Sequence, residues 1–248
     1  MMTETEYQVL QERLQSVKAR IAAAAQKAGR EPSEILLVAA TKMNDAERVQ
    51  AAIQMGLTAC GENRVQELLE KYDKHAYDGA DLQFIGTLQT NKVKYLVGKV
   101  SLIQSVGSIK LAECIAKEAK KHEICQNILL EVNIGREPAK SGFLPEALSE
   151  ALEELPKLSN IHICGLMAIP PISAEQRESN RYFAEMKQLF VDISTKKYDN
   201  VSMDYLSMGM TADFEQAIAC GANIVRVGTG IFGRRPYAQT NVVMGNLK

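Results

Sequence analysis

Lys42 stands directly after an apolar run, residues 35–41, whose composition is typical of a buried strand. Partial burial at such a strand end favours the neutral amine, which is the form that attacks a carbonyl carbon. The same position also suits a lysine whose stem lies on apolar residues while its ammonium group reaches water. From position alone, Schiff-base chemistry and a solvated lysine are both interpretations of Lys42.

Two glycine-bearing segments suit an anion such as a phosphate. One is Gly228-Thr229-Gly230, and the other contains Ser207 and Gly209. Glycine lets a backbone approach a ligand closely, and successive N–H groups form a concave nest for an anion. The same glycines would also serve tight turns without any ligand. Asp213 would repel a nearby phosphate, so we expect loop amides rather than the following helix to hold the anion.

Arg226 lies two residues before Gly228, so both positions share one face of a predicted strand. An arginine that faces the inside of a protein needs a partner, because an unpaired buried charge is costly. A bound cofactor is one such partner. A carboxylate such as Glu62 is the alternative.

The elements that must position these residues repeat as an apolar strand followed by a helical pattern. The predicted strands are 35–40, 58–60, 82–85, 102–105, 128–133, 162–168, 205–207 and 224–227. Several are apolar throughout, as parallel strands buried on both faces are. Eight such units in about 215 residues predict an α/β fold of the TIM (β/α)8 barrel type, and a doubly wound open sheet is the alternative.

Helical patterns fill the intervals between these strands, at 45–55, 65–72, 109–121, 145–155, 175–194 and 212–219. An extra N-terminal helix is predicted over 3–28, with Thr3 or Thr5 as its cap and Gly29 at its end. No linker divides the chain, so we expect a single domain over 1–248 with the barrel at 34–235. Active sites of TIM barrels lie at the C-terminal ends of the strands, where the residues above would meet.

Composition argues against several classes of protein. The 248 residues carry 29 Lys and Arg against 30 Asp and Glu, which is unlike a general nucleic-acid binder. No apolar run approaches the roughly 18 residues of a membrane span. Five scattered cysteines without a CxxC pair, beside only three histidines, match no zinc spacing, so no metal is expected. We expect the cysteines to be buried thiols of a cytoplasmic protein.

The segments around the singled-out residues resemble the pyridoxal-phosphate homeostasis proteins, the YggS/PROSC family, of the alanine-racemase-like barrel group. The matching segments are LLVAATK (36–42), GENRVQE (61–67), FIGTLQTNK (84–92), IQSVGS (103–108), EVNIGREPAKSG (131–142), GLMAIPP (165–171), LSMGMTADFEQAI (206–218) and VRVGTGIFGRR (225–235). They follow one another in the family's order over nearly the whole predicted barrel. That combination is highly specific.

The resemblance implies that the cofactor is pyridoxal 5'-phosphate (PLP). Lys42 matches the lysine that forms the internal aldimine, and Asn63 matches the asparagine of the GEN motif beside the cofactor. Arg226 matches the arginine that faces the pyridine nitrogen, which leaves the ring a weak electron sink and fits a carrier. The phosphate-holding positions of the family match Ser207, Gly228 and Thr229.

The chain departs from the family pattern at two places. Ala40-Thr41-Lys42-Met43-Asn44 replaces a segment that often has serine before the aldimine lysine and proline after it. Gln83 stands where the family often has histidine. We expect both changes to tune the edge of the site while leaving the amine in place.

The function that the resemblance implies is PLP binding for vitamin B6 and amino-acid homeostasis, with no catalytic residue. Its partners would be PLP and apo-enzymes that accept it, and the protein would be a monomer or weak dimer. An amino-acid racemase is an alternative, but it needs a second base, which in the racemase relatives is a tyrosine of an added C-terminal domain. Only about 20 residues follow the last predicted strand, and Tyr237 there lacks a supporting context. A Schiff-base aldolase is a third possibility, with Lys140 as a competing amine or a salt-bridging loop residue.

Overall fold

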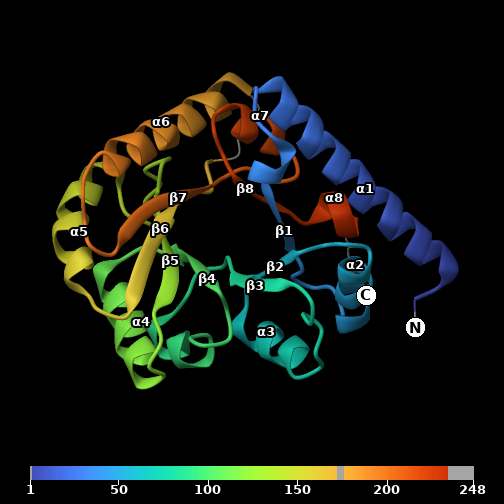
Figure 1. Cartoon of the computed structure of the whole chain (residues 1–248), viewed down its shortest axis with the longest axis horizontal. Coiled ribbons are helices and arrows are strands. Elements are labelled where there is room, and N and C mark those ends of the chain that lie inside the picture. Colours follow the sequence, from blue (N-terminus) through green and yellow to red (C-terminus); the bar gives the residue numbers. More distant parts are fainter. Residues whose placement is uncertain (1, 172–175, 234–248) are drawn as a thin grey trace, which may run out of the picture.

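The structure, a computed structural model, describes residues 2–171 and 176–233. Eight parallel strands close into one barrel in chain order, and the last strand pairs with the first (Figure 1). Closure pairs every strand on both sides, whereas an open doubly wound sheet would leave two unpaired edges. The predicted TIM barrel is therefore confirmed, and the open sheet is excluded.

The strands of the barrel are short. They are β1 (Leu36–Ala40), β2 (Ala59–Glu62), β3 (Asp81–Phe84), β4 (Leu102–Val106), β5 (Gln126–Glu131), β6 (Ile161–Met167), β7 (Val201–Ser207) and β8 (Ile224–Val227). Each overlaps its predicted range. β2 runs on to Glu62. β7 begins at Val201. The sequence pattern missed this first part of β7 because Ser202 and Asp204 interrupt the apolar run that marks a buried strand.

β5 ends earlier than predicted, because Asn133 belongs to a turn. Its side-chain Nδ2 donates to the carbonyl oxygen of Glu137 at 2.8 Å, and its Oδ1 accepts from the Glu137 N–H at 3.1 Å. An asparagine that bonds nearby backbone groups in this way offers the chain an alternative to the strand ladder. The apolar neighbours of Asn133 hid that alternative in the sequence pattern.

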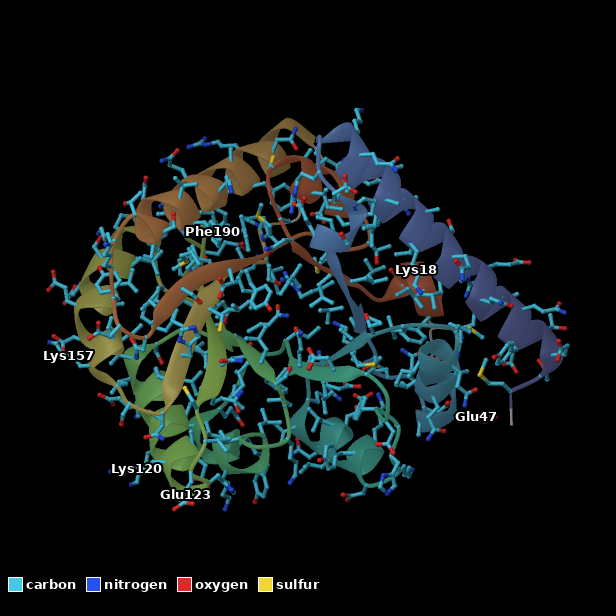
Figure 2. The ribbon with its side chains drawn as sticks, in the orientation of Figure 1. Lys18, Glu47, Lys120, Glu123, Lys157 and Phe190 are labelled. Atoms are coloured by element: carbon cyan, nitrogen blue, oxygen red, sulfur yellow. The ribbon has the colours of Figure 1, made fainter. Side chains whose placement is uncertain are left out.

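Helices surround the barrel on the outside (Figure 1). The α-helices are α1 (Glu4–Lys27), α2 (Ala46–Gln54), α3 (Val65–Tyr72), α4 (Ile109–Lys121), α5 (Leu148–Glu154), α6 (Gln176–Ser194), α7 (Phe214–Ala219) and α8 (Thr229–Phe232). The 3₁₀ helices are η1 (Pro32–Glu34), η2 (Thr90–Tyr95), η3 (Pro145–Ala147) and η4 (Leu155–Lys157). Figure 2 shows Lys120, Glu123 and Lys157 pointing outward, whereas Phe190 of α6 packs against the core.

α1 begins with a capping box. The Thr3 hydroxyl accepts the Glu6 N–H at 3.3 Å, and the Glu6 carboxylate accepts the Thr3 N–H at 2.8 Å. Thr3, rather than Thr5, is therefore the cap. Gly29 follows the helix in the left-handed region, with φ of +69°, which glycine adopts without strain. The helix lies along α7 and α8 and buries one apolar stripe against them (Figure 1).

The cysteines only partly match their prediction. Cys60 and Cys164 are buried, Cys114 and Cys220 are half-buried, and Cys125 is exposed. The prediction of buried thiols is therefore wrong for Cys125, which lies directly before β5. All five are free thiols.

Within residues 2–171 and 176–233, no helix is both long and apolar enough to cross a membrane. The same residues contain no cluster of three potential metal ligands among histidine, cysteine, aspartate and glutamate. Arg234, Arg235 and Tyr237 lie outside the described residues.

Substitution of Leu14 by alanine tests the packing of α1. Leu14 is fully buried, so its removal leaves a cavity, and the free energy of unfolding should fall by about 2–5 kcal/mol. Urea denaturation measures the change. Gln15→Ala, one residue along on the exposed face, should stay within about 0.5 kcal/mol of the parent. Equal stabilities for the two variants would show that α1 does not pack here.

Candidate functional site

A cavity of about 460 Å³ opens at the C-terminal ends of the strands. This volume lies in the range of small-molecule sites, and the location is that of TIM-barrel active sites. The lining residues are Ala40, Lys42, Asn63, Ile85, Gly86, Thr87, Glu131, Ile169, Met210, Thr211, Ala212, Arg226, Gly228 and Thr229. Among them, the ionisable side chains are Lys42, Glu131 and Arg226.

The alternation of side chains along each strand explains which residues reach this cavity. Val38, Leu129 and Ile224 belong to the apolar cluster inside the barrel. Side chains two residues apart share a face, so the interior direction continues from these three residues toward the strand ends. It leads from Val38 to Lys42, from Leu129 to Glu131, and from Ile224 to Arg226.

The structure brings together five of the six residues singled out in the sequence. Lys42, Asn63, Arg226, Gly228 and Thr229 all line the cavity. Ser207 lies deeper and is fully buried. Its hydroxyl accepts a hydrogen bond from Nη1 of Arg226 and donates one to Oε1 of Gln104 at 2.6 Å. In this structure Ser207 therefore supports the arginine of the site, and does not itself line the cavity.

Arg226 is held from behind as a donor. It is only 4% exposed, and Nη2 donates to the carbonyl oxygen of Ala168 at 2.8 Å. Burial lowers the pKa of Arg226 to about 10, and the charge of Glu131 opposes that shift. Glu131, rather than the suggested Glu62, is thus the carboxylate that shares the cavity with Arg226. Glu62 faces the other side of the sheet, because it is an odd number of residues from the interior-facing Ala59.

Glu131 was not singled out in the sequence as a site residue. Burial raises the pKa of its carboxyl, while a hydrogen bond from the Ser141 hydroxyl, at 3.0 Å, and the charge of Arg226 lower it. The signal for Glu131 was its place at the end of a strand, two residues beyond the interior-facing Leu129. Within the cavity its charge opposes that of Arg226.

A row of polar side chains continues from Arg226 across the barrel interior. After the Ser207 hydroxyl, Nε2 of Gln104 donates to Oε1 of Gln83 at 2.6 Å, and Nε2 of Gln83 donates to Asp81 at 2.7 Å. Every group in the row donates away from Arg226. Gln83, expected to tune the edge of the site, is instead buried beneath it and linked to Arg226 through two side chains.

The loops after β7 and β8 meet beside Arg226. Oγ1 of Thr211 lies 3.2 Å from Oγ1 of Thr229 and accepts the Gly230 N–H at 3.3 Å. Gly209 has φ of +90°, and a Cβ there would lie 2.6 Å from Cβ of Ala217, so this turn requires glycine. Met210 and Thr211, which follow Gly209, and Gly228 and Thr229 therefore form one continuous wall of the cavity, whereas Ser207 and Gly209 do not line it.

Asn63 and Gly86, which follow β2 and β3, form another part of the wall. A Cβ on Gly86 would lie 2.3 Å from the carbonyl oxygen of Asn63, so the two backbones can approach this closely only with glycine. Oδ1 of Asn63 is buried and has no hydrogen-bond partner among the residues that the structure describes. A buried acceptor without a partner fits a site whose polar ligand supplies the donor.

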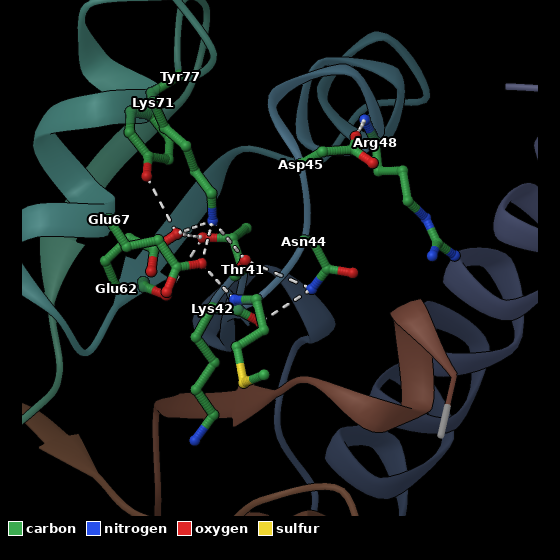
Figure 3. A network of polar contacts seen from close by, with 11 residues as sticks. Thr41, Lys42, Asn44, Asp45, Arg48, Glu62, Glu67, Lys71 and Tyr77 are labelled. Carbon is green, nitrogen blue, oxygen red and sulfur yellow. Dashed lines mark hydrogen bonds and ion pairs between the residues drawn. The ribbon is translucent and has the colours of Figure 1, made fainter. Parts of the chain in front are cut away.

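The two candidate amines have different surroundings. Lys42 is half-buried and lines the cavity, and Figure 3 shows its side chain extending away from the polar groups near α3. Nζ of Lys140 instead pairs with Glu137 at 2.5 Å in an exposed loop and does not line the cavity. The salt-bridge interpretation therefore holds for Lys140.

Substitution of Ser207 by alanine tests the support of Arg226. The change removes a hydrogen-bond acceptor from a buried guanidinium and a donor from Gln104, so the free energy of unfolding should fall by about 1–3 kcal/mol. Denaturation with urea gives this value. Ser33→Ala, at an exposed position of η1, should change stability by less than about 0.5 kcal/mol. An unchanged stability of Ser207→Ala would mean that the hydroxyl does not hold Arg226.

Comparison with known proteins gives a consistent result. The family described as "Alanine racemase, N-terminal domain" matches residues 13–236. A pyridoxal phosphate homeostasis protein of Aquifex aeolicus is 45% identical over 228 residues, which cover 91% of this chain and 98% of the relative.

Two solved structures extend this comparison. A protein of Bifidobacterium adolescentis is 35% identical, with a TM-score of 0.87 over 94% of this chain and 98% of its own. PipY of Synechococcus elongatus, solved with PLP bound, is 29% identical, with a TM-score of 0.79 over 90% of this chain and 100% of its own. The sequence identity, the coverage and the shared barrel agree, and the chain belongs to the family of pyridoxal phosphate homeostasis proteins.

Proposed function

We propose that the protein binds PLP in the cavity at the C-terminal ends of the strands and holds it as an internal aldimine on Lys42. Its role would be PLP homeostasis, with little or no catalysis of its own. The observation that carries the proposal is the convergence of three groups in one cavity. A half-buried lysine, a buried arginine and two joined glycine-bearing loops all line it.

These groups fit the three functional parts of PLP. The amine of Lys42 suits the aldehyde, and the joined loops that contain Gly209 and Gly228 suit the phosphate. Arg226 suits the pyridine nitrogen. The unpartnered Oδ1 of Asn63 would accept a hydrogen bond from the ligand or from a water bound to it. When bound, PLP supplies an electrophilic aldehyde carbon, to which the Lys42 nitrogen forms a C=N bond while the aldehyde oxygen leaves as water.

The surroundings of Arg226 support weak catalysis. Although burial lowers its pKa to about 10, Arg226 keeps its proton at neutral pH. A permanent donor does not hold a proton on the pyridine nitrogen as a carboxylate does, so the ring withdraws electrons less strongly. Ser207 and Ala168 fix the guanidinium in this donor role.

Amino-acid racemisation is the second candidate, and Glu131 is the observation that bears on it. A racemase needs one acid or base on each face of the substrate carbanion. Among the described residues of the cavity, Glu131 is the one carboxylate that could act beside Lys42. The Arg226 environment would nevertheless keep any such activity slow.

Transfer and location form part of the same proposal. PLP-dependent apo-enzymes would accept PLP from a cavity whose rim includes the partly exposed Ile169 and Met210. The five free thiols support a reducing compartment such as the cytoplasm.

Replacement of Lys42 tests where PLP attaches. The purified protein, saturated with PLP, should show the visible absorption band of an imine, and Lys42→Ala should lose it, because the band requires the Lys42 nitrogen. Lys140→Ala is the matched control and should keep the band, since Lys140 is paired in an exposed loop. A band that survives in Lys42→Ala, or that disappears in Lys140→Ala, would contradict the assignment.

Turnover of L-alanine distinguishes a carrier from a racemase. We expect the PLP-loaded protein to racemise L-alanine well below about 1 per second, the low end of ordinary enzyme rates. Chiral chromatography of the product measures it. A rate at or above that value, abolished in Glu131→Gln, would support the racemase and contradict the carrier.

A further inference from the structure

A cluster of buried charges lies on the outer side of the sheet, between β2 and α3, and does not line the cavity. Glu62 is fully buried, and its Oε1 accepts hydrogen bonds from Nζ of Lys71 at 2.7 Å, from the Thr41 hydroxyl at 2.7 Å and from the Tyr77 hydroxyl at 3.0 Å (Figure 3). Glu67 joins the cluster through Lys71 at 2.8 Å. We call Glu62, Glu67 and Lys71 the outer charge cluster.

A buried ion pair is weak evidence of a stabilising role, so stability alone is a poor explanation for this cluster. Moving charges out of water costs free energy that their mutual attraction often fails to recover, and apolar side chains of similar volume are frequently as stabilising. Burial raises the pKa of Glu62, and Lys71 opposes that shift. Oε2 of Glu62 is also buried without a hydrogen-bond partner among the residues described.

The bonds of the cluster converge on the two peptide units that flank Lys42. Nζ of Lys71 donates to the carbonyl oxygen of Thr41 at 2.8 Å. On the other side of Lys42, the Met43 N–H donates to the Glu67 carboxylate (Figure 3). Met43 has φ of +60°, in the left-handed region that residues with side chains rarely adopt. A turn of this kind persists only where its surroundings impose it.

We propose that the outer charge cluster positions Lys42 by clamping the backbone on both of its sides. The Thr41 carbonyl and the Met43 N–H are bonded to the cluster, whereas the side chain of Lys42 between them lines the cavity. Bonds made outside the barrel thereby set the direction in which the Lys42 side chain extends. The groups that would contact the phosphate and the ring of PLP do not depend on the cluster. This inference rests on the proposed attachment of PLP to Lys42.

The proposal makes a specific kinetic statement. The step concerned joins Nζ of Lys42 to the aldehyde carbon of PLP as C=N, and the oxygen departs as water with the two amine hydrogens. A misplacement of about 1 Å can slow such a reaction by about a hundredfold. Loosening the clamp should therefore slow the covalent step far more than it weakens non-covalent PLP binding.

Two variants test the clamp. The double variant Glu62→Leu/Lys71→Met removes both partners of the buried pair at once, and such replacements are often tolerated or stabilising. Glu67 loses Lys71 in this variant but keeps the Met43 N–H as a donor. Glu67→Ala removes the acceptor of the Met43 N–H and one of the two carboxylates on Lys71, and leaves the Glu62–Lys71 pair in place. Glu70→Ala, an exposed glutamate one turn along α3, is the matched control.

The measurement is the initial rate at which borohydride reduction traps PLP on the Lys42 peptide. Non-covalent affinity is measured by equilibrium dialysis with Lys42→Ala added to each variant. We expect the trapping rate to fall at least about tenfold in both variants and to stay unchanged in Glu70→Ala. The dialysis constants should change less than about threefold, because the cavity wall is intact.

Other outcomes overturn the inference. Folded variants that trap PLP at the parental rate would show that the cluster does not position Lys42. A rate loss matched by an equal loss of non-covalent affinity would show a general disturbance of the cavity. If the double variant does not fold, Glu67→Ala decides alone. Failure of the parent protein to trap PLP on Lys42 would instead refute the proposed function, so the two failures are distinguishable.

Discussion

Closure of the sheet is the constraint on which the rest of the structure depends. Once eight parallel strands close, every second side chain must point into a common interior, and all C-terminal strand ends meet at one mouth. Lys42, Glu131 and Arg226 lie on three strands or strand ends far apart in the sequence, yet each follows an interior-facing apolar residue by an even number of positions. Their convergence requires no contact between them, because the strand period already provides it.

Two cations are buried on opposite sides of this sheet, and the protein accommodates them differently. Inside, Arg226 donates to the neutral oxygens of Ser207 and Ala168 and shares the cavity with Glu131, so it remains available to a ligand. Outside, Lys71 is neutralised by two carboxylates and has no access to the cavity. The first arrangement suits a binding group, and the second suits a structural clamp.

The repeating pattern made the barrel predictable. Continuous apolar runs separated by helical patterns identified all eight strands. The rule that TIM-barrel sites lie at the C-terminal strand ends directed attention to Lys42 and to the segment that contains Arg226. Asn63 was identified only through the family resemblance, because a single asparagine after a short strand does not by itself indicate a binding site. Details that depend on side-chain partners were not predictable. The depth of Ser207 and the hydrogen bonds that link Gln104 and Gln83 to Arg226 follow from contacts between segments distant in the sequence, which periodicity does not encode. The turn at Asn133 is local, but the apolar residues around it continue the strand pattern.

A crystal structure of the protein grown with PLP tests the central claim most directly, which is that one cavity holds the cofactor through Lys42. We predict continuous density from Nζ of Lys42 to the cofactor, with the phosphate against the joined loops that contain Gly209 and Gly228, and the pyridine nitrogen facing Arg226. Density for PLP attached to another lysine, or a phosphate bound away from these loops, would contradict the account.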